Sequence, residues 1–304
     1  MKNILLGGVL PVPTIAVGCM RIHGMSDQAA GEFLTTAMEC GMHFFDHADI
    51  YGGGKSEEVF AGGMKAAGIR REDVLIQTKC GIRKGMFDFS KQHILESVDG
   101  SLKRLNTDYV DLLLLHRPDA LMEPDEVAEA FDTLAASGKV RHFGVSNQNS
   151  LQMELLARSL HQPIIANQLQ MSVMCTGMID SGLHVNMKDD AAVNRDGMVL
   201  DYCRLHNITI QPWSPFQYGF FEGVFLDNDK FPTLNTVINE IAAQYQVTNT
   251  AIAIAWLLRH PAKMQPVLGT TNTQRIRDIS KATDITLTRE EWYRIYLAAG
   301  NILP

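Results

Sequence analysis

Short apolar runs alternate with longer amphipathic runs along the 304-residue chain, and this alternation predicts an α/β fold. Most of the short runs are almost entirely apolar, as expected for parallel strands that are covered on both faces. The expected strands are residues 14–17, 42–46, 74–78, 110–115, 140–145, 164–168, 208–213 and 264–268. Eight strand–helix units in this length predict a closed (β/α)₈ (TIM) barrel, with residues 1–304 forming a single domain.

Helix start and stop residues support this reading of the connections. Ser26 and Ser90 each precede a run with apolar residues at helical spacing, as N-caps do. Pro124 opens a third helix and Gly138 closes it. Two further helices are expected over residues 234–245 and 248–259.

Two long connections, residues 171–197 and 215–232, stand out between the expected elements. Long loops in a compact domain are usually lids or binding loops, and loops that follow barrel strands form the active face. We therefore expect both loops at the site, with ordinary surface insertion as the alternative.

The composition excludes several classes of function. The chain has 27 Lys and Arg against 34 Asp and Glu, a net charge of −7 with no basic run, so no nucleic-acid partner is expected. No apolar stretch is long enough for a membrane span, and the N-terminal apolar run is too short and broken for a signal peptide. Five scattered cysteines without a CxxC pair indicate free thiols in a cytoplasmic protein.

Polar residues follow five of the expected strands, at the carboxyl end where a barrel carries its active site. They are Asp46, Lys79, His116, Ser146, Asn147, Asn167 and Gln168. Nearby Tyr51 holds its proton at neutral pH, and we expect Lys79 to lower its pKa while Asp46 keeps Lys79 charged. Such a tyrosine can protonate a developing alkoxide, with His116 bonded to the same oxygen.

This set contains no strong nucleophile, so the hydride for a carbonyl reduction has to come from a cofactor. His43 and His47 flank Asp46, but their spacing with Asp49 matches no ligand pattern, and we expect no metal site. Two bland interpretations remain open at this point. Asp46 and Lys79 can form a purely structural ion pair, and His116 can be a core histidine.

The segment FDHADIYGGGKSEE (residues 45–58) resembles the signature of the aldo-keto reductase family, in which an Asp precedes the catalytic Tyr by five residues. Six further segments resemble other blocks of that family and occur in family order. They are the TK pair at 78–79, YVDLLLLHRPD, GKVRHFGVSN, ANQLQMS, QPWSPFQYG and LGTTNTQRIRD. The chain is therefore identified as a member over almost its whole length.

The resemblance implies a role for each matching residue. The catalytic set would be Asp46, Tyr51, Lys79 and His116. The cofactor would contact Gly18, Met20, Ser146, Asn147, Gln168, Trp213, Ser214, Pro215, Gly269, Thr270, Thr271, Asn272, Gln274, Arg275 and Asp278. Among these, Ser146, Asn147 and Gln168 would hydrogen-bond the nicotinamide carboxamide, and Trp213 would stack on the ring. Ser214 and Pro215 would shape the pyrophosphate path, and the residues from Thr270 onward would surround the adenosine end.

We expect NADPH as the cofactor, with NADH possible. A 2′-phosphate requires an arginine and hydroxyl donors, which Arg275, Thr270 and Thr271 offer. Many family members carry a Lys where this chain has Gly269, and its loss weakens a strict NADPH preference. No GxGxxG fingerprint indicates a Rossmann site.

The expected function is reduction of aldehydes and ketones to alcohols by hydride transfer from NAD(P)H, with Tyr51 as general acid. The alternatives are a cofactor-binding redox-sensing or regulatory subunit with little turnover, and another barrel enzyme such as an aldolase or a metal hydrolase. An aldolase would use Lys79 as a Schiff base, which Asp46 opposes by holding it protonated. We expect a monomer or small homo-oligomer.

The mouth of the pocket is expected to include Met20, Phe87 or Phe89, Arg117, Trp213 and part of the 171–197 loop. This apolar lining favours small aldehydes, ketones or quinones over anionic sugars, with broad specificity. Arg117 either attracts a carboxylate substrate or pairs with Asp119 two residues on; the sequence leaves both open.

Overall fold

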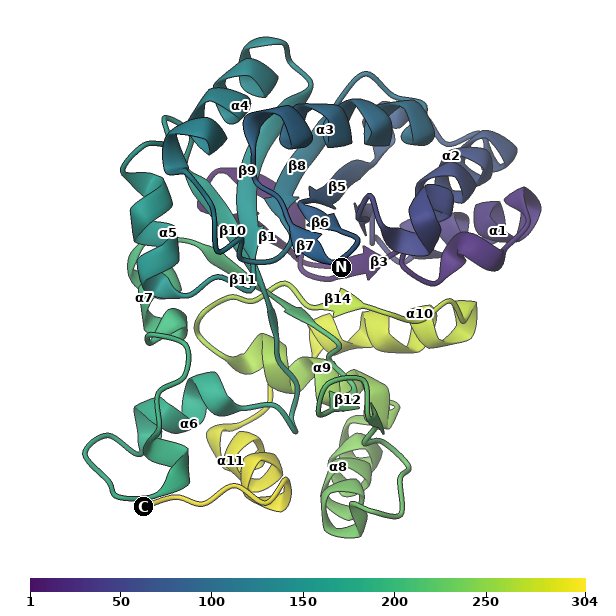
Figure 1. The fold of residues 1–304 in the computed structure, drawn as a ribbon. Coiled ribbons are helices and arrows are strands. Elements are labelled where there is room, and N and C mark those ends of the chain that lie inside the picture. Colours follow the sequence, from purple (N-terminus) through teal and green to yellow (C-terminus); the bar gives the residue numbers. More distant parts are fainter.

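Eight parallel strands form the centre of the computed structural model, which describes residues 1–304 (Figure 1). Their order is β11-β10-β9-β8-β5-β4-β3-β14. The bounds are β3 Ala16–Gly18, β4 Phe44–Asp46, β5 Leu75–Cys80, β8 Val110–Leu115, β9 Val140–Ser146, β10 Ile164–Gln170, β11 Thr209–Trp213 and β14 Val267–Leu268. Each overlaps its predicted range. The Gln265 N–H donates to the Ile210 carbonyl oxygen at 3.0 Å and links the two end strands, so the predicted (β/α)₈ barrel is confirmed.

A helix follows each barrel strand and covers the outside of the sheet. These helices are α1 Asp27–Glu39, α2 Lys55–Ala67, α3 Lys91–Leu105, α4 Pro124–Ala136, α5 Ser150–Ala157, α7 Val199–Leu205, α9 Asn249–Arg259 and α10 Thr273–Ser280. The predicted N-caps are confirmed, because Ser26 accepts from the Ala29 N–H and Ser90 from the His93 N–H. That residues 1–304 form one domain stays a prediction.

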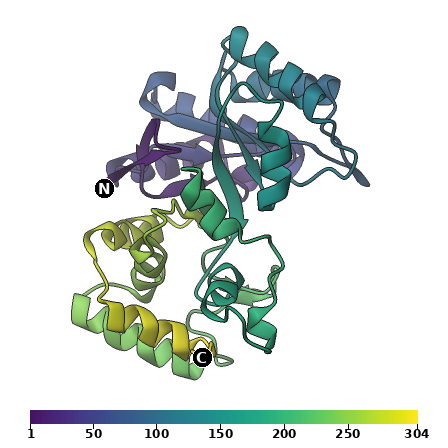
Figure 2. The ribbon, with the colours of Figure 1, turned by 90° about the vertical axis from the view of Figure 1, so that its left-hand side faces the viewer.

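Three additional helices, α6 Gly177–Leu183, α8 Pro232–Tyr245 and α11 Arg289–Ala298, lie at the end of the molecule opposite α3 and α4 (Figures 1 and 2). α8 and α11 pack against each other. The short elements are η1 Ile22–Gly24, η2 Tyr51–Gly54, η3 Arg71–Asp73, η4 Asp190–Ala192, η5 Lys281–Asp284, β6 Ile82–Arg83, β7 Met86–Phe87, β12 Gln217–Tyr218 and β13 Gly223–Val224. No helix combines the length and the apolar character that a membrane crossing requires.

An antiparallel hairpin that the sequence analysis missed, β1 (Asn3–Leu6) and β2 (Leu10–Pro13), covers the amino ends of the barrel strands. Its Leu6 and Val12 are fully buried against side chains from inside the barrel. At the turn, the Gly7 N–H donates to Thr209 Oγ1, in the first residue of β11, at 2.9 Å. The hairpin therefore closes this end, and the carboxyl ends of the strands remain for the site.

Candidate active site

Lys79, the next-to-last residue of β5, lies fully buried at the centre of the predicted catalytic set. Its Nζ lies 2.7 Å from Asp46 Oδ1, 2.7 Å from the His47 carbonyl oxygen and 3.1 Å from Tyr51 Oη. Burial lowers the pKa of Lys79, but Asp46 and Tyr51 together raise it by more, so the net pKa lies above the ordinary value. Lys79 is therefore a charged ammonium that points at the phenol of Tyr51.

Tyr51 begins the turn η2, which three glycines build. Gly52, Gly53 and Gly54 all have positive φ, a backbone conformation that residues other than glycine rarely adopt. A Cβ at Gly52 would come within 2.6 Å of His23 Cβ, and one at Gly54 within 2.8 Å of Arg104 Cδ. This turn is therefore packed against His23 and Arg104, and the packing fixes Tyr51.

The pKa of Tyr51 shifts opposite to the prediction. Burial raises it, and this effect outweighs the lowering caused by Lys79, so the net pKa lies above the ordinary value. The expected net lowering is wrong, although the contribution of Lys79 has the predicted sign. The consequence is that Tyr51 is protonated at neutral pH and can act as a proton donor.

His116, directly after β8, faces Tyr51 with the two ring centroids 6.0 Å apart at an interplanar angle of 82°. Burial lowers the pKa of His116 well below its usual value, and the positive charges of Lys79 and Arg117 lower it further. The imidazole is therefore neutral, and its buried Nδ1 has no partner within the protein. A neutral imidazole can hydrogen-bond a carbonyl oxygen without adding a charge beside Lys79.

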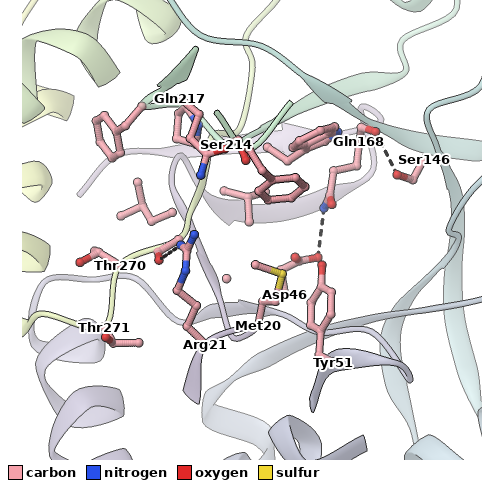
Figure 3. A pocket seen from close by; sticks show the side chains of 18 of the residues that line it. Met20, Arg21, Asp46, Tyr51, Ser146, Gln168, Ser214, Gln217, Thr270 and Thr271 are labelled. Atoms are coloured by element: carbon pink, nitrogen blue, oxygen red, sulfur yellow. Dashed lines mark hydrogen bonds between the residues drawn. The ribbon is translucent and has the colours of Figure 1, made fainter. Parts of the chain in front are cut away.

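A chain of buried glutamines inside the barrel hydrogen-bonds Asp46. Gln77 and Gln168 both donate to Asp46 Oδ1, the latter at 3.0 Å (Figure 3). Gln211 donates to Gln77 Oε1 at 2.9 Å and to Gln265 Oε1 at 2.8 Å. Gln265 in turn donates to the Pro13 carbonyl oxygen at 2.7 Å. Gln77, Gln211 and Gln265 were not predicted, because nothing in the sequence indicates that polar residues within separate apolar strands meet inside one barrel.

A cavity of about 740 Å³ opens at the carboxyl ends of the strands. Figure 3 shows Tyr51 and Asp46 on one side of it and Arg21, Thr270 and Thr271 on the other. The predicted residues that line it are Gly18, Met20, Asp46, Tyr51, His116, Ser146, Asn147, Gln168, Trp213, Ser214, Pro215, Gly269, Thr270, Thr271, Asn272 and Arg275. Lys79 lies behind Tyr51, outside the lining. Gln274 and Asp278 also lie outside it, on α10, where they hydrogen-bond each other at 3.0 Å.

Hydrogen bonds fix one wall of the cavity. Ser146 Oγ donates to the Gln168 carbonyl oxygen at 3.1 Å and accepts from Asn147 Nδ2 at 2.7 Å. Trp213 Nε1 donates to Asn147 Oδ1 at 3.1 Å. These residues, three of which were predicted to contact a nicotinamide carboxamide, therefore form one rigid group beside Tyr51.

Arg21, which the sequence analysis did not identify, occupies the space beside Gly269. Its Nη1 donates to the Gly269 carbonyl oxygen, and a Cβ at position 269 would lie 2.7 Å from that nitrogen. The guanidinium therefore lies near position 269, where many family members carry a Lys and this chain has a glycine. No local signal marks Arg21, because it reaches this place from the loop after β3.

Two expectations about the mouth of the cavity are wrong. No residue of 171–197 lines it, because that segment packs on the C-terminal residues: His184 Nε2 contacts the Ile302 carbonyl oxygen at 2.9 Å. Phe87 and Phe89 do not line it either, since Phe87 is exposed and Phe89 is buried in the core. The 215–232 loop does contribute, with Pro215, Phe216, Gln217, Phe221 and Val224. The lining also includes Arg21, His23, Ile50, Gly52, Ile82, Arg117, Val267 and Leu268.

The residues present suit a phosphorylated nicotinamide cofactor. The cavity runs from Tyr51 to the N-terminus of α10, where Arg275 and the hydroxyls of Thr270 and Thr271 face it. A helix N-terminus with an arginine attracts a phosphate, while the protonated tyrosine at the other end serves a carbonyl oxygen. The barrel and this site define a nicotinamide-dependent carbonyl reductase.

Comparison with known proteins agrees. Residues 14–298 match the Aldo/keto reductase family. A 6-dehydroglucose reductase of Agrobacterium fabrum is 36% identical, with 99% of each chain covered. The oxidoreductase YdhF of Escherichia coli is 34% identical over 90% of this chain and 89% of its own. The crystal structure of the thermostable aldo-keto reductase Tm1743 with the inhibitor epalrestat superposes with a TM-score of 0.78, at 28% identity, covering 98% of this chain and 100% of that one.

The chain belongs to the aldo/keto reductase family. It is an oxidoreductase that reduces aldehydes or ketones to alcohols, and its cofactor is NADP(H).

Proposed function

We propose that Tyr51 is the general acid of this reductase. The observation that carries the proposal is the 3.1 Å contact from Lys79 Nζ to Tyr51 Oη within a buried site. As Tyr51 gives its proton to the carbonyl oxygen, a phenolate forms, and the adjacent ammonium stabilises that charge far better than water would at this depth. Asp46 holds Lys79 charged and in place, so it supports the step without touching the substrate.

His116 would hydrogen-bond the same carbonyl oxygen and orient it toward Tyr51. Its neutral state is consistent with this role, because a neutral imidazole still carries one ring N–H that can donate to the carbonyl oxygen. NADPH, when bound, would supply the hydride that the carbonyl carbon accepts and would be oxidised to NADP⁺. The reaction then balances as carbonyl plus hydride plus the Tyr51 proton giving the alcohol.

The wall of Ser146, Asn147 and Gln168 would hold the nicotinamide carboxamide, and Trp213 would pack on the ring. Ser214 and Pro215 would follow the pyrophosphate, and Arg275 with Thr270 and Thr271 would hold the 2′-phosphate. We propose that Arg21 is a second cation for this phosphate, because it lies beside Gly269, where many family members carry a Lys. Because Arg21 and Arg275 would both bind the 2′-phosphate, we propose a preference for NADPH over NADH.

We also propose that the protein works in the cytoplasm, where its five free cysteines would stay reduced, as a monomer or small homo-oligomer. The complete set of Asp46, Tyr51, Lys79 and His116 supports turnover over a purely regulatory role.

The test is NADPH oxidation by the purified protein with a panel of small uncharged aldehydes and ketones, with the product identified by mass spectrometry. The expected result is stoichiometric formation of the alcohol for several members of the panel. NADPH binding without alcohol formation for any carbonyl would contradict the proposal and favour the regulatory alternative.

A further inference from the structure

Arg117 is a cation of the active-site cavity that has no partner. It follows His116 after β8, is partly buried and lines the same cavity as Tyr51. The guanidinium forms no ion pair and no hydrogen bond within the protein; it lies 5.6 Å from the ring centroid of Trp213 and 5.9 Å from that of Phe220. Packing on aromatic faces holds a guanidinium in place and leaves its N–H donors, which lie in the plane of the guanidinium, free to bind another group.

The carboxylate that could have neutralised Arg117 is used elsewhere. Asp119 accepts from the Phe89 N–H through Oδ2 and from the Leu121 N–H through Oδ1, both at 2.9 Å. Asp46, the single acidic residue of the cavity lining, is paired with Lys79. Pairing of Arg117 with Asp119, which the sequence left open, is therefore excluded, and the cavity keeps a free positive charge beside the reacting position.

Arg117 is placed for a substrate rather than for the cofactor phosphates. It adjoins His116 and acts electrostatically on both His116 and Tyr51. Thr270 and Thr271, which suit a phosphate, lie at the other end of the cavity with Arg21 (Figure 3). Arg275, in the first turn of α10, lines the cavity a few residues further along the chain. The half-buried guanidinium of Arg117 also carries a desolvation cost, which binding of an anion would offset.

We propose that Arg117 is an anion subsite, and that the physiological substrate is an aldehyde or ketone that carries a carboxylate. The carbonyl oxygen would sit between Tyr51 and His116, while the carboxylate would bind the guanidinium edge over Trp213. This proposal rests on the proposed function and revises the expectation of uncharged substrates. It names a second contact point that orients the carbonyl, as bidentate arginine–carboxylate pairing does elsewhere.

The test compares matched aldehydes that differ in charge: 4-carboxybenzaldehyde against 4-formylbenzamide, and succinic semialdehyde against its methyl ester. In the wild-type protein kcat/KM is expected to be at least about tenfold higher for the anion of each pair, the effect of one charge-assisted hydrogen bond. Arg117→Met is expected to abolish this ratio mainly through KM of the anion, and Arg117→Lys to restore part of it. Arg158→Met, which removes an exposed arginine with no ion pair, is the matched control and should keep the wild-type ratio.

Three results would overturn the proposal. They are equal kcat/KM for both members of each pair in the wild type, an Arg117→Met variant that keeps the anion preference, and a loss of NADPH affinity in that variant, which would assign Arg117 to the cofactor. Failure of the proposed function is distinguishable, because the protein would then reduce neither the neutral nor the anionic aldehyde.

Discussion

Gln168 Nε2 donates a hydrogen bond to Asp46 Oδ1 at 3.0 Å, so a side chain predicted to contact the cofactor also holds the carboxylate that is predicted to be catalytic. Gln77 donates to the same oxygen from the other side. Asp46 is thus fixed by two amides as well as by Lys79, and it can hold the ammonium in a single position. Through Lys79, this arrangement links the polar interior of the barrel to Tyr51, the proposed proton donor.

The first prediction concerns Gln77. Gln77→Leu is expected to lower the free energy of unfolding by about 1–3 kcal/mol, because it removes one of the two acceptors of the Gln211 amide and one of the donors to Asp46. It should also lower kcat without raising the Kd of NADPH, since Gln77 does not line the cavity. Urea unfolding and NADPH titration measure both effects. Gln28→Leu, at an exposed glutamine, should change neither, and an unaffected kcat in Gln77→Leu would contradict this positioning role.

The second prediction concerns the cofactor phosphate. Arg275→Ala and Arg21→Ala are each expected to raise the Kd of NADPH by about tenfold while changing the Kd of NADH much less. Arg277→Ala is the matched control, because Arg277 pairs with Glu39 on the surface. Fluorescence titration with both cofactors measures the effect. A parallel loss of NADPH and NADH affinity would assign these arginines to the pyrophosphate rather than to the 2′-phosphate.

The third prediction concerns pH. Burial, with the nearby Glu57 carboxylate, raises the pKa of Asp49 to about 7 from an ordinary 3.8. Between these two values the folded protein keeps a proton that the unfolded chain has lost, so this group's contribution to stability falls as pH rises. Between these pH values, Asp49 should make the free energy of unfolding of the wild type fall by at most about 1.4 kcal/mol per pH unit, and Asp49→Asn should abolish this contribution.

Urea unfolding of wild type and Asp49→Asn at pH 5 and pH 7.5 checks this sign. Asp73→Asn is the contrasting control, because Arg70 lowers the pKa of Asp73 and its contribution is lost only as pH falls. A difference between wild type and Asp49→Asn that stays constant with pH would refute the assignment.

The fourth prediction concerns the hairpin that closes the barrel. Gly7 and Gly8 both have positive φ, but only at Gly7 would a Cβ meet a neighbour, within 2.3 Å of Ile165 Cβ. Gly7→Ala should therefore lower the free energy of unfolding by about 1–3 kcal/mol more than Gly8→Ala, which carries the backbone strain alone. Equal losses in the two variants would mean that the hairpin does not pack on the barrel as described.

The strands and the clustering of the polar strand ends were predictable because they depend on local pattern. Asp46, Lys79 and His116 each follow an apolar run, and parallel strands bring such ends together in any barrel. Arg21 was not predictable, since its place beside Gly269 depends on how two distant loops meet. The 171–197 segment was misplaced for a related reason: its length suggested a lid, but Tyr296 and Ile302 of the C-terminal region bind it instead.

The direction of the net pKa shift of Tyr51 could not be predicted from the sequence either. The charge of Lys79 could be foreseen from its position, whereas the larger effect of burial depends on the packing of the finished site.

The most direct test of the central claim is the NADPH-dependent reduction of 4-formylbenzamide by Tyr51→Phe. We expect kcat to fall by at least about a hundredfold while the Kd of NADPH stays near that of the wild type, because the substitution removes only the proton donor. Tyr202→Phe, which removes an exposed phenol bonded to Glu154, should keep wild-type kcat. A Tyr51→Phe variant that turns over at the wild-type rate would show that the proton comes from another group.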